Sequence, residues 1–126
     1  MRRLALILSA LSLAATGSAF AGRGGNVPVP QIPRVPGHWS HVEINLRIRN
    51  TPHTLILDRG PVVEVSPTSI TLRELGSPAV IPLSDQTLVV IRGRPATTSD
   101  LRRKMIVVTM RIDGGAAVRV RATFFK

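Results

Sequence analysis

Short aliphatic runs separated by turn-forming residues dominate the sequence between residues 59 and 104. The runs are rich in Val and Ile, which favour strands, and Gly, Pro, Ser and Asp separate them. Gly or Pro interrupts almost every window in which a helix could form. The one helix-start signal is a group of Thr, Ser and Asp residues before Leu101, enough for about one turn over residues 98–103. The pattern predicts an all-β domain with one short helix.

The core of such a domain has to consist of Val, Ile and Leu. Aromatic residues make up 3% of the 126 residues, and the chain contains neither Tyr nor Cys. The absence of Cys excludes disulfides, thiolate catalysis and Cys-ligated metal sites. A chain of this length holds one domain, so its stability must come from the packing of a single aliphatic core.

The N-terminal segment has the layout of a secretory signal peptide. Two Arg residues precede an apolar run over residues 4–15, and the small residues Ala19 and Ala21 suit a signal peptidase site. We expect cleavage after Ala21 and export to the periplasm or the cell exterior, with no transmembrane segment left in the product. The processed chain would keep 15 basic and 7 acidic residues. This excess favours anionic partners, and a solvated basic surface without a specific partner is the competing interpretation.

Residues 22–37 combine three early Gly residues with four Pro residues, a composition that excludes a helix or a central strand. We therefore divide the chain into a signal peptide (1–21), a flexible Pro/Gly-rich arm (22–37) and a β domain (38–126). Trp39 is expected to pin the arm or to cap the open end of a barrel. His38 and His41 have no third ligand in sequence reach except the distant His53, so we predict no metal and place the imidazoles of His38 and His41 in solvent.

The strands of the domain follow from local patterns. Residues 42–48 alternate between apolar and polar without a fault, which is typical of a half-buried strand. A second strand should run from Thr54 to Val65, and Gly60 before Pro61 is expected to break its ladder as a bulge or bend. We interpret the neighbouring Asp58 as structural rather than catalytic. Asp113 and the two Gly residues after it predict a hairpin between the last two strands.

From about Leu57 to Ala122 the order of strands and turns resembles a family of exported bacterial domains of unknown function. The resemblance rests on GPVVEV at 60–65, SITL at 69–72, DQT at 85–87, DL at 100–101 and MIVV at 105–108. It implies an OB-like barrel and an exported location, and no activity. Where the family has Gly two or three residues after its Asp-Leu pair, this chain has Arg102, Arg103 and Lys104, so the geometry of that turn is open.

The number and order of the predicted strands agree with this resemblance. Three strands, a short helix and two further strands is the order of the OB fold, with the strand at 42–48 as an N-terminal addition. We expect a small OB-like barrel of five to six strands. A different small barrel or an open sandwich is the alternative.

Nothing in the sequence recommends an enzyme. The three His residues lie in the N-terminal half, no G-x-S-x-G motif occurs, and the seven acidic residues are scattered singly between strands. We therefore predict no catalytic residue and no cofactor.

Basic residues on the predicted outward faces and turns are the candidate binding groups. They would serve a non-enzymatic binding module of the cell envelope for anionic ligands or polymers. Its expected OB-like binding surfaces carry no aromatic side chains for stacking, which argues against single-stranded nucleic acid. A structural or assembly module, pairing with another envelope protein through a sheet edge or the arm, is the alternative. Partner and oligomeric state stay open. The candidate anion-binding residues are Arg47, Arg49, Arg73, Arg102, Arg103, Lys104, Arg119 and Arg121.

Overall fold

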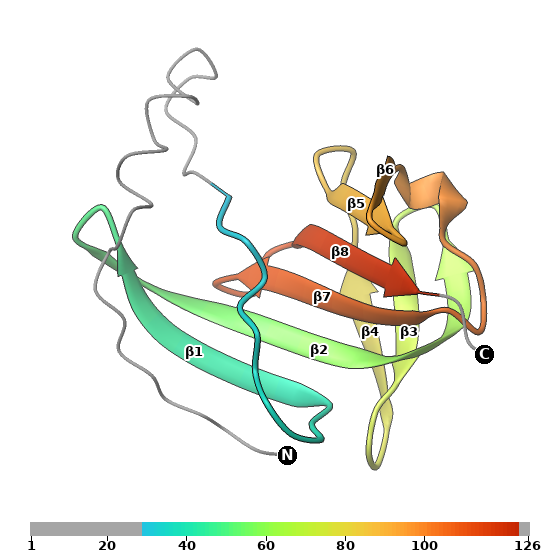
Figure 1. Cartoon of the computed structure of the whole chain (residues 1–126), viewed down its shortest axis with the longest axis horizontal. Coiled ribbons are helices and arrows are strands. Elements are labelled where there is room, and N and C mark those ends of the chain that lie inside the picture. Colours follow the sequence, from blue (N-terminus) through green and yellow to red (C-terminus); the bar gives the residue numbers. More distant parts are fainter. Residues whose placement is uncertain (1–28, 124–126) are drawn as a thin grey trace.

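The computed structural model describes residues 29–123 (Figure 1). The predicted signal peptide and the first part of the predicted arm lie outside the described residues. Within them the chain is all-β, as the sequence predicts, and its one helical element is the 3-10 turn η2 (Thr98–Asp100). No helix in residues 29–123 is long and apolar enough to cross a membrane. The strands are β1 (His41–Ile48), β2 (Thr51–Ser66), β3 (Ser69–Arg73), β4 (Pro78–Pro82), β5 (Leu88–Ile91), β6 (Arg94–Ala96), β7 (Ile106–Ile112) and β8 (Ala117–Thr123).

The long strand β2 connects two parts of one sheet. Its first half pairs with β1 and its second half with β3, while β7 follows its other edge. The hydrogen-bonded path runs β4-β3-β2-β7-β8-β5-β6, and the only parallel ladder joins β5 to β8 among the described strands. Figure 1 shows β2 extending beneath β7, with β3 and β4 crossing at its far end.

The expected small barrel of five to six strands is not what the sheet forms, because it has eight strands, counting β1 beside the path, and it is not closed. Two local features explain the higher count. Pro82 and the turn after it separate β4 from β5, and the turn at Arg92 and Gly93, both with positive φ, folds β5 back into β6. The hairpin of β5 and β6 was not predicted, because β6 has only three residues and one of them is a proline.

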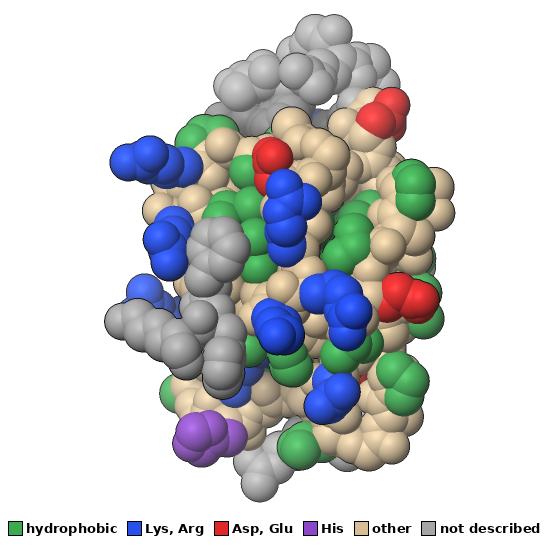
Figure 2. All heavy atoms as spheres, turned by 90° about the vertical axis from the view of Figure 1, so that its right-hand side faces the viewer, with side chains coloured by type: hydrophobic (Ala, Val, Ile, Leu, Met, Phe, Trp, Pro, Cys, Tyr) green, Lys and Arg blue, Asp and Glu red, His purple; other side chains and the backbone are tan. Residues whose placement is uncertain are grey.

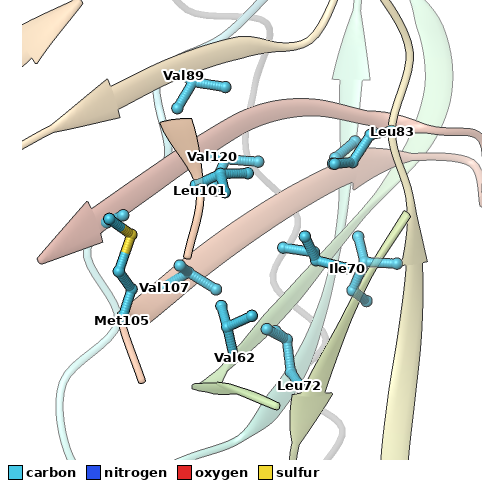
Figure 3. Packing of buried hydrophobic residues seen from close by; sticks show 12 residues of the cluster. Val62, Ile70, Leu72, Leu83, Val89, Leu101, Met105, Val107 and Val120 are labelled. Carbon is cyan, nitrogen blue, oxygen red and sulfur yellow. The ribbon is translucent and has the colours of Figure 1, made fainter. Parts of the chain in front are cut away.

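Each face of the sheet has its own hydrophobic core. One core is built where β3, β4, β5, β7 and β8 converge, and Leu101 and Met105 close it from the loop before β7 (Figure 3). The other lies on the opposite face of β1, β2 and β7 and includes Ile44, Leu57 and Met110. The alternating pattern at 42–48 therefore predicts β1 correctly, since its apolar side chains all belong to this second core.

The described part of the arm covers the second core. Ile32, Val35 and Trp39 pack against it, and the Trp39 indole N–H donates to the Val35 carbonyl at 3.0 Å. The prediction that Trp39 pins the arm is thus confirmed by its contacts. The boundary at residue 37 stays a prediction, but residues 29–37 lie on the sheet rather than apart from it.

Two arginines attach the arm at its ends. Arg119 of β8 donates from Nε to the Pro30 carbonyl at 2.7 Å and from Nη2 to the Val29 carbonyl at 3.3 Å. Arg59 of β2 donates from Nε to the Trp39 carbonyl at 2.9 Å, and its guanidinium carbon lies 4.3 Å from the centroid of the Trp39 ring. Pro-rich backbone has few ladder partners, so these side chains satisfy carbonyls that would otherwise lack donors.

Gly60 allows β2 and the end of β3 to approach closely. It does not break the ladder of β2, as the sequence had led us to expect. The β2–β7 ladder continues through it, with Gly60 opposite Val107, and the register shift lies further on, between Val62 and Glu64. A Cβ atom on Gly60 would lie 2.4 Å from the carbonyl oxygen of Arg73. The end of β3 can cross β2 at this point only because the residue has no side chain.

We predict that Gly60→Ala destabilises the fold by about 1 to 3 kcal/mol, the usual cost of forced overpacking, because backbone rather than a flexible side chain must move. Gly115→Ala is the matched control, since its Cβ would meet its nearest neighbour, the Ile112 carbonyl, at an ordinary 3.6 Å. Urea unfolding of both variants and the wild type measures the effect. Equal losses in the two variants would contradict the close approach.

Candidate functional site

Ionisable side chains gather on the face of the sheet opposite Leu57. Two neighbouring rows cross the strands there: Thr109, Asp58 and His41 form the first, and Arg111, Ile56 and Glu43 form the second. Asp58 is only 2% exposed, so a carboxylate lies inside the sheet with a histidine beside it.

His41 lies between two carboxylates. Its Nδ1 is 2.7 Å from Asp58 Oδ1, and its Nε2 is 3.0 Å from Glu43 Oε2. Burial lowers the pKa of His41, but the hydrogen bonds to Asp58 and Glu43 outweigh it, so the net pKa is raised. The expectation that this imidazole sits in solvent is wrong, because its side chain is 12% exposed.

Glu74 joins the cluster from the residue that follows β3. The Gly60 contact brings the end of β3 across β2, and this places Glu74 next to Asp58. Burial, followed by the neighbouring Asp58 carboxyl, raises the pKa of Glu74 to about 8, while Arg111 opposes the shift. Arg111 Nη2 is 3.5 Å from Asp58 Oδ2. Asp58 Oδ2 and Glu74 Oε2 are buried and have no hydrogen-bond partner.

An open cleft of about 500 Å³ lies beside the cluster. Its walls include Trp39 and Arg59 on one side and Arg73 and Glu74 on the other. Glu74 therefore belongs both to the buried cluster and to the cleft wall, which gives the cluster a route to solvent.

The other two histidines lie elsewhere. His53 is opposite Leu46 at the far end of the β1–β2 ladder and pairs with Asp113 of the β7–β8 turn. His38 is exposed in the cleft wall. The three histidines therefore do not meet at one site, in agreement with their spacing.

The predicted basic residues are divided between the two faces of the sheet. The ladders place Arg47 of β1 on the same face as Asp58, whereas Arg119 and Arg121 of β8 are on the face that the arm covers. Arg119 does not point outward as expected, because it is half-buried and holds the arm carbonyls. Burial lowers its pKa. Arg49 is exposed in the β1–β2 turn, far from these residues along the ladder.

A second group of basic residues meets at the end of β8. Residues 102–104 precede β7, whose first residue is opposite Thr123, and the Arg92 backbone N–H donates to the Ala122 carbonyl at 3.1 Å. The side chains of these residues are exposed. Figure 2 views the molecule from this side and shows Lys and Arg side chains gathered there, with few acidic ones. We call this surface the basic end; it consists of Arg92, Arg94, Arg102, Arg103 and Lys104.

Three of these five residues, Arg102, Arg103 and Lys104, are predicted from the sequence. Arg92 and Arg94 were missed because the β5–β6 hairpin was missed, although the sequence Arg-Gly-Arg is itself a turn signal. Arg73 lies apart, in the cleft wall. Asp58 and Glu74 were missed because they lie 16 residues apart in the sequence and meet only through the Gly60 crossing. An acidic residue directly after the apolar run at residues 55–57, inside a predicted strand, is the signal that could have identified Asp58.

The chain matches no protein-family model, no curated protein and no solved structure. The resemblance to exported bacterial domains therefore stays a prediction, and function has to be argued from the geometry.

We predict that stability falls as the pH rises from about 5 to about 8. Glu74 has a pKa of about 8 in the fold against an ordinary 4.5, so the folded state binds more protons in this range and loses stability as they leave. His41 acts in the same direction above its ordinary 6.5, because its pKa is also raised. Glu43, Asp58 and Arg111 face the same cluster from β1, β2 and β7.

Urea unfolding across this pH range, in the presence of a chelator, checks the effect. Glu74→Gln should flatten the profile, since it fixes the neutral form. Glu64→Gln, at an exposed position of β2, should keep the wild-type slope. Parallel profiles for Glu74→Gln and the wild type would show that Glu74 titrates normally.

Proposed function

We propose that this chain is a non-enzymatic binding module for anionic ligands or polymers of the cell envelope, acting after export to the periplasm or the cell exterior. The observation that carries the proposal is the basic end. Its residues come from two segments separated in sequence, and both reach the same end of β8.

The acidic residue next to this surface, Asp100, offsets only part of its positive charge. The Asp100 carboxylate accepts the Thr97 backbone N–H at 2.9 Å and so closes the η2 turn. This backbone hydrogen bond is the main cause of the lowered pKa of Asp100, which keeps the group ionised and engaged in the turn. The guanidinium and ammonium groups of the loop remain exposed around it.

Such a surface suits a polyanion better than a base-specific ligand. Binding through exposed Arg and Lys side chains is loose and depends on salt, since it rests on counterion release. Trp39 is the one aromatic residue among residues 29–123, and it stacks on Arg59 away from the basic end. Among residues 29–123, base stacking therefore has no platform at the basic end, which argues against single-stranded nucleic acid.

An OB-like arrangement is part of the same proposal. The path β4-β3-β2-β7-β8-β5, with β5 parallel to β8 and η2 ahead of β7, supports an OB-like order in which the third strand is interrupted between β4 and β5. In this arrangement β1 is an N-terminal addition. The proposed relationship to exported domains with an OB-like fold rests on the same order of strands.

The assembly alternative has one supporting observation. β4 lies at one end of the strand path, and Val80 on it is 63% exposed. Pro78 and Pro82 bound this strand, however, and proline at an edge discourages pairing with another chain. The described part of the arm already contacts its own sheet, so a partner strand would add at a sheet edge such as that of β4 or of β1.

We predict that Arg102→Gln/Arg103→Gln lowers the salt concentration at which the protein elutes from an anionic polymer column. Arg47→Gln/Arg49→Gln is the matched control, because it removes the same charge from exposed positions at the other end of the sheet. The control should elute close to the wild type. If the two double variants elute together, net charge alone governs binding and the basic end is not a site. Failure of the wild type to bind at low salt would favour the assembly alternative.

A further inference from the structure

The buried cluster offers three ligand atoms of two chemical kinds. One imidazole nitrogen of His41 and one carboxylate oxygen each of Asp58 and Glu74 lie within 4.8 Å of one another. We propose that these residues bind a divalent transition-metal ion, and that Zn²⁺ is the ion their chemistry suits. This inference does not depend on the basic end or on an anionic ligand.

Buried carboxylate oxygens without a hydrogen-bond partner are the first support. Asp58 Oδ2 and Glu74 Oε2 are both buried and accept no hydrogen bond, and Asp58 Oδ2 has an ion pair with Arg111 Nη2 at 3.5 Å. Nearly all buried polar atoms in proteins have a hydrogen-bond partner, and an ion is one of the explanations for an exception. Among residues 29–123, two of the four buried side-chain atoms without such a partner belong to ligand residues, and the other two are Thr109 Oγ1 and Arg111 Nε.

The position of Glu43 is the second and independent support. Glu43 Oε2 is 3.0 Å from His41 Nε2, on the side of the ring away from Asp58. A carboxylate in this place holds the proton on Nε2 when Nδ1, which hydrogen-bonds to Asp58 Oδ1 in the structure, gives up its own proton to bind an ion. Metal-binding histidines almost always have such an outer partner.

The charges of the cluster also suit a divalent cation. Glu43, Asp58 and Glu74 supply three negative charges when ionised, and Arg111 supplies one positive charge at 3.5 Å from Asp58 Oδ2. The remaining charge of about −2, with His41 neutral, is the charge that a divalent ion balances. Arg111 therefore reduces the net negative charge of the cluster, and it also competes with the ion for the Asp58 carboxylate.

The strands position the ligands, and the cleft gives the ion access. His41 and Asp58 face each other across the β1–β2 ladder, and Gly60 fixes the approach of Glu74. With bonds of about 2.1 Å, the ligand atoms of a tetrahedral zinc ion lie about 3.4 Å apart. The three ligand atoms lie within 4.8 Å of one another, and His41 Nδ1 and Asp58 Oδ1, now 2.7 Å apart, would have to separate slightly. Glu74 lines the cleft, which leaves the fourth position open to solvent.

Imidazole with two carboxylates is a borderline ligand set that favours Zn²⁺ and related ions over Mg²⁺ or Ca²⁺, which prefer oxygen alone. The competing occupant of the same space is a proton on Glu74, shared with Asp58 Oδ2. A shared proton or a metal ion would each give the two carboxylate oxygens a partner. Only the metal ion would also need His41 Nδ1 as a ligand.

Isothermal titration of the chelator-treated full-length protein with Zn²⁺, repeated with Co²⁺ while recording visible absorption, tests the proposal. We expect one ion per chain and the intense bands of low-coordinate Co²⁺. Glu74→Gln should weaken binding at least tenfold, and Glu43→Gln, which alters the outer partner, by about 10- to 100-fold. Glu74 is half-buried, so its variant tests the site even if Asp58→Asn does not fold.

Two control variants define the background. Glu64→Gln removes an exposed carboxylate from β2, and His53→Gln removes the histidine of the separate pair with Asp113. Both should bind Zn²⁺ as the wild type does. Loss of binding in His53→Gln with none in Glu74→Gln would assign the ion to an adventitious surface site and overturn the proposal. Absence of Co²⁺ bands in the wild type would also overturn it and leave the shared proton as the explanation.

Discussion

The crossing of β3 over β2 at Gly60 is the contact on which the rest of the structure depends. A backbone carbonyl occupies the space where a side chain would be, so the two strands approach more closely than any other residue at this position would allow. The approach lets β3 and β4 turn across the sheet and enclose the core around Ile70 and Leu72. It also places Glu74 next to Asp58. One glycine thus links the packing of the larger core to the chemistry of the buried cluster.

The second face of the sheet depends on arginine rather than on glycine. The Pro-rich segment before β1 cannot join a ladder, yet its apolar residues cover Ile44, Leu57 and Met110. Arg59 and Arg119 supply the missing donors at its two ends, and each guanidinium can satisfy more than one carbonyl. The many arginines of the sequence therefore have two kinds of environment. Some of these side chains hold the fold together, and those at the basic end are exposed to solvent.

Local patterns in the sequence predict local structure well. The alternation at residues 42–48 gives β1, Asp113 with Gly114 gives the β7–β8 turn, and the Thr-rich segment before Leu101 gives η2. These features depend on the period of side chains and on the φ angles that single residues tolerate. Neither requires knowledge of the rest of the chain.

The features that the sequence could not predict arise from contacts between distant residues. The sequence around Gly60 is compatible with a bulge and equally with a close approach by another strand. Only the position of Arg73 in the fold distinguishes the two. Arg119 bonds to a carbonyl 89 residues away, so no pattern near it distinguishes a clamp from an exposed charge. The cluster of His41, Asp58 and Glu74 likewise exists only after three segments meet. Acidic residues that looked scattered become neighbours through the ladder register and one close approach.

The Gly60 crossing holds the half-buried Glu74 against Asp58. Titration of the Glu74 side-chain carboxyl by carbon NMR, on isotopically labelled and metal-free wild-type protein, tests this arrangement most directly. We expect a midpoint of about 8 for Glu74. A midpoint near the ordinary 4.5 would show a solvated carboxylate, and it would contradict both the close approach and the cluster built on it.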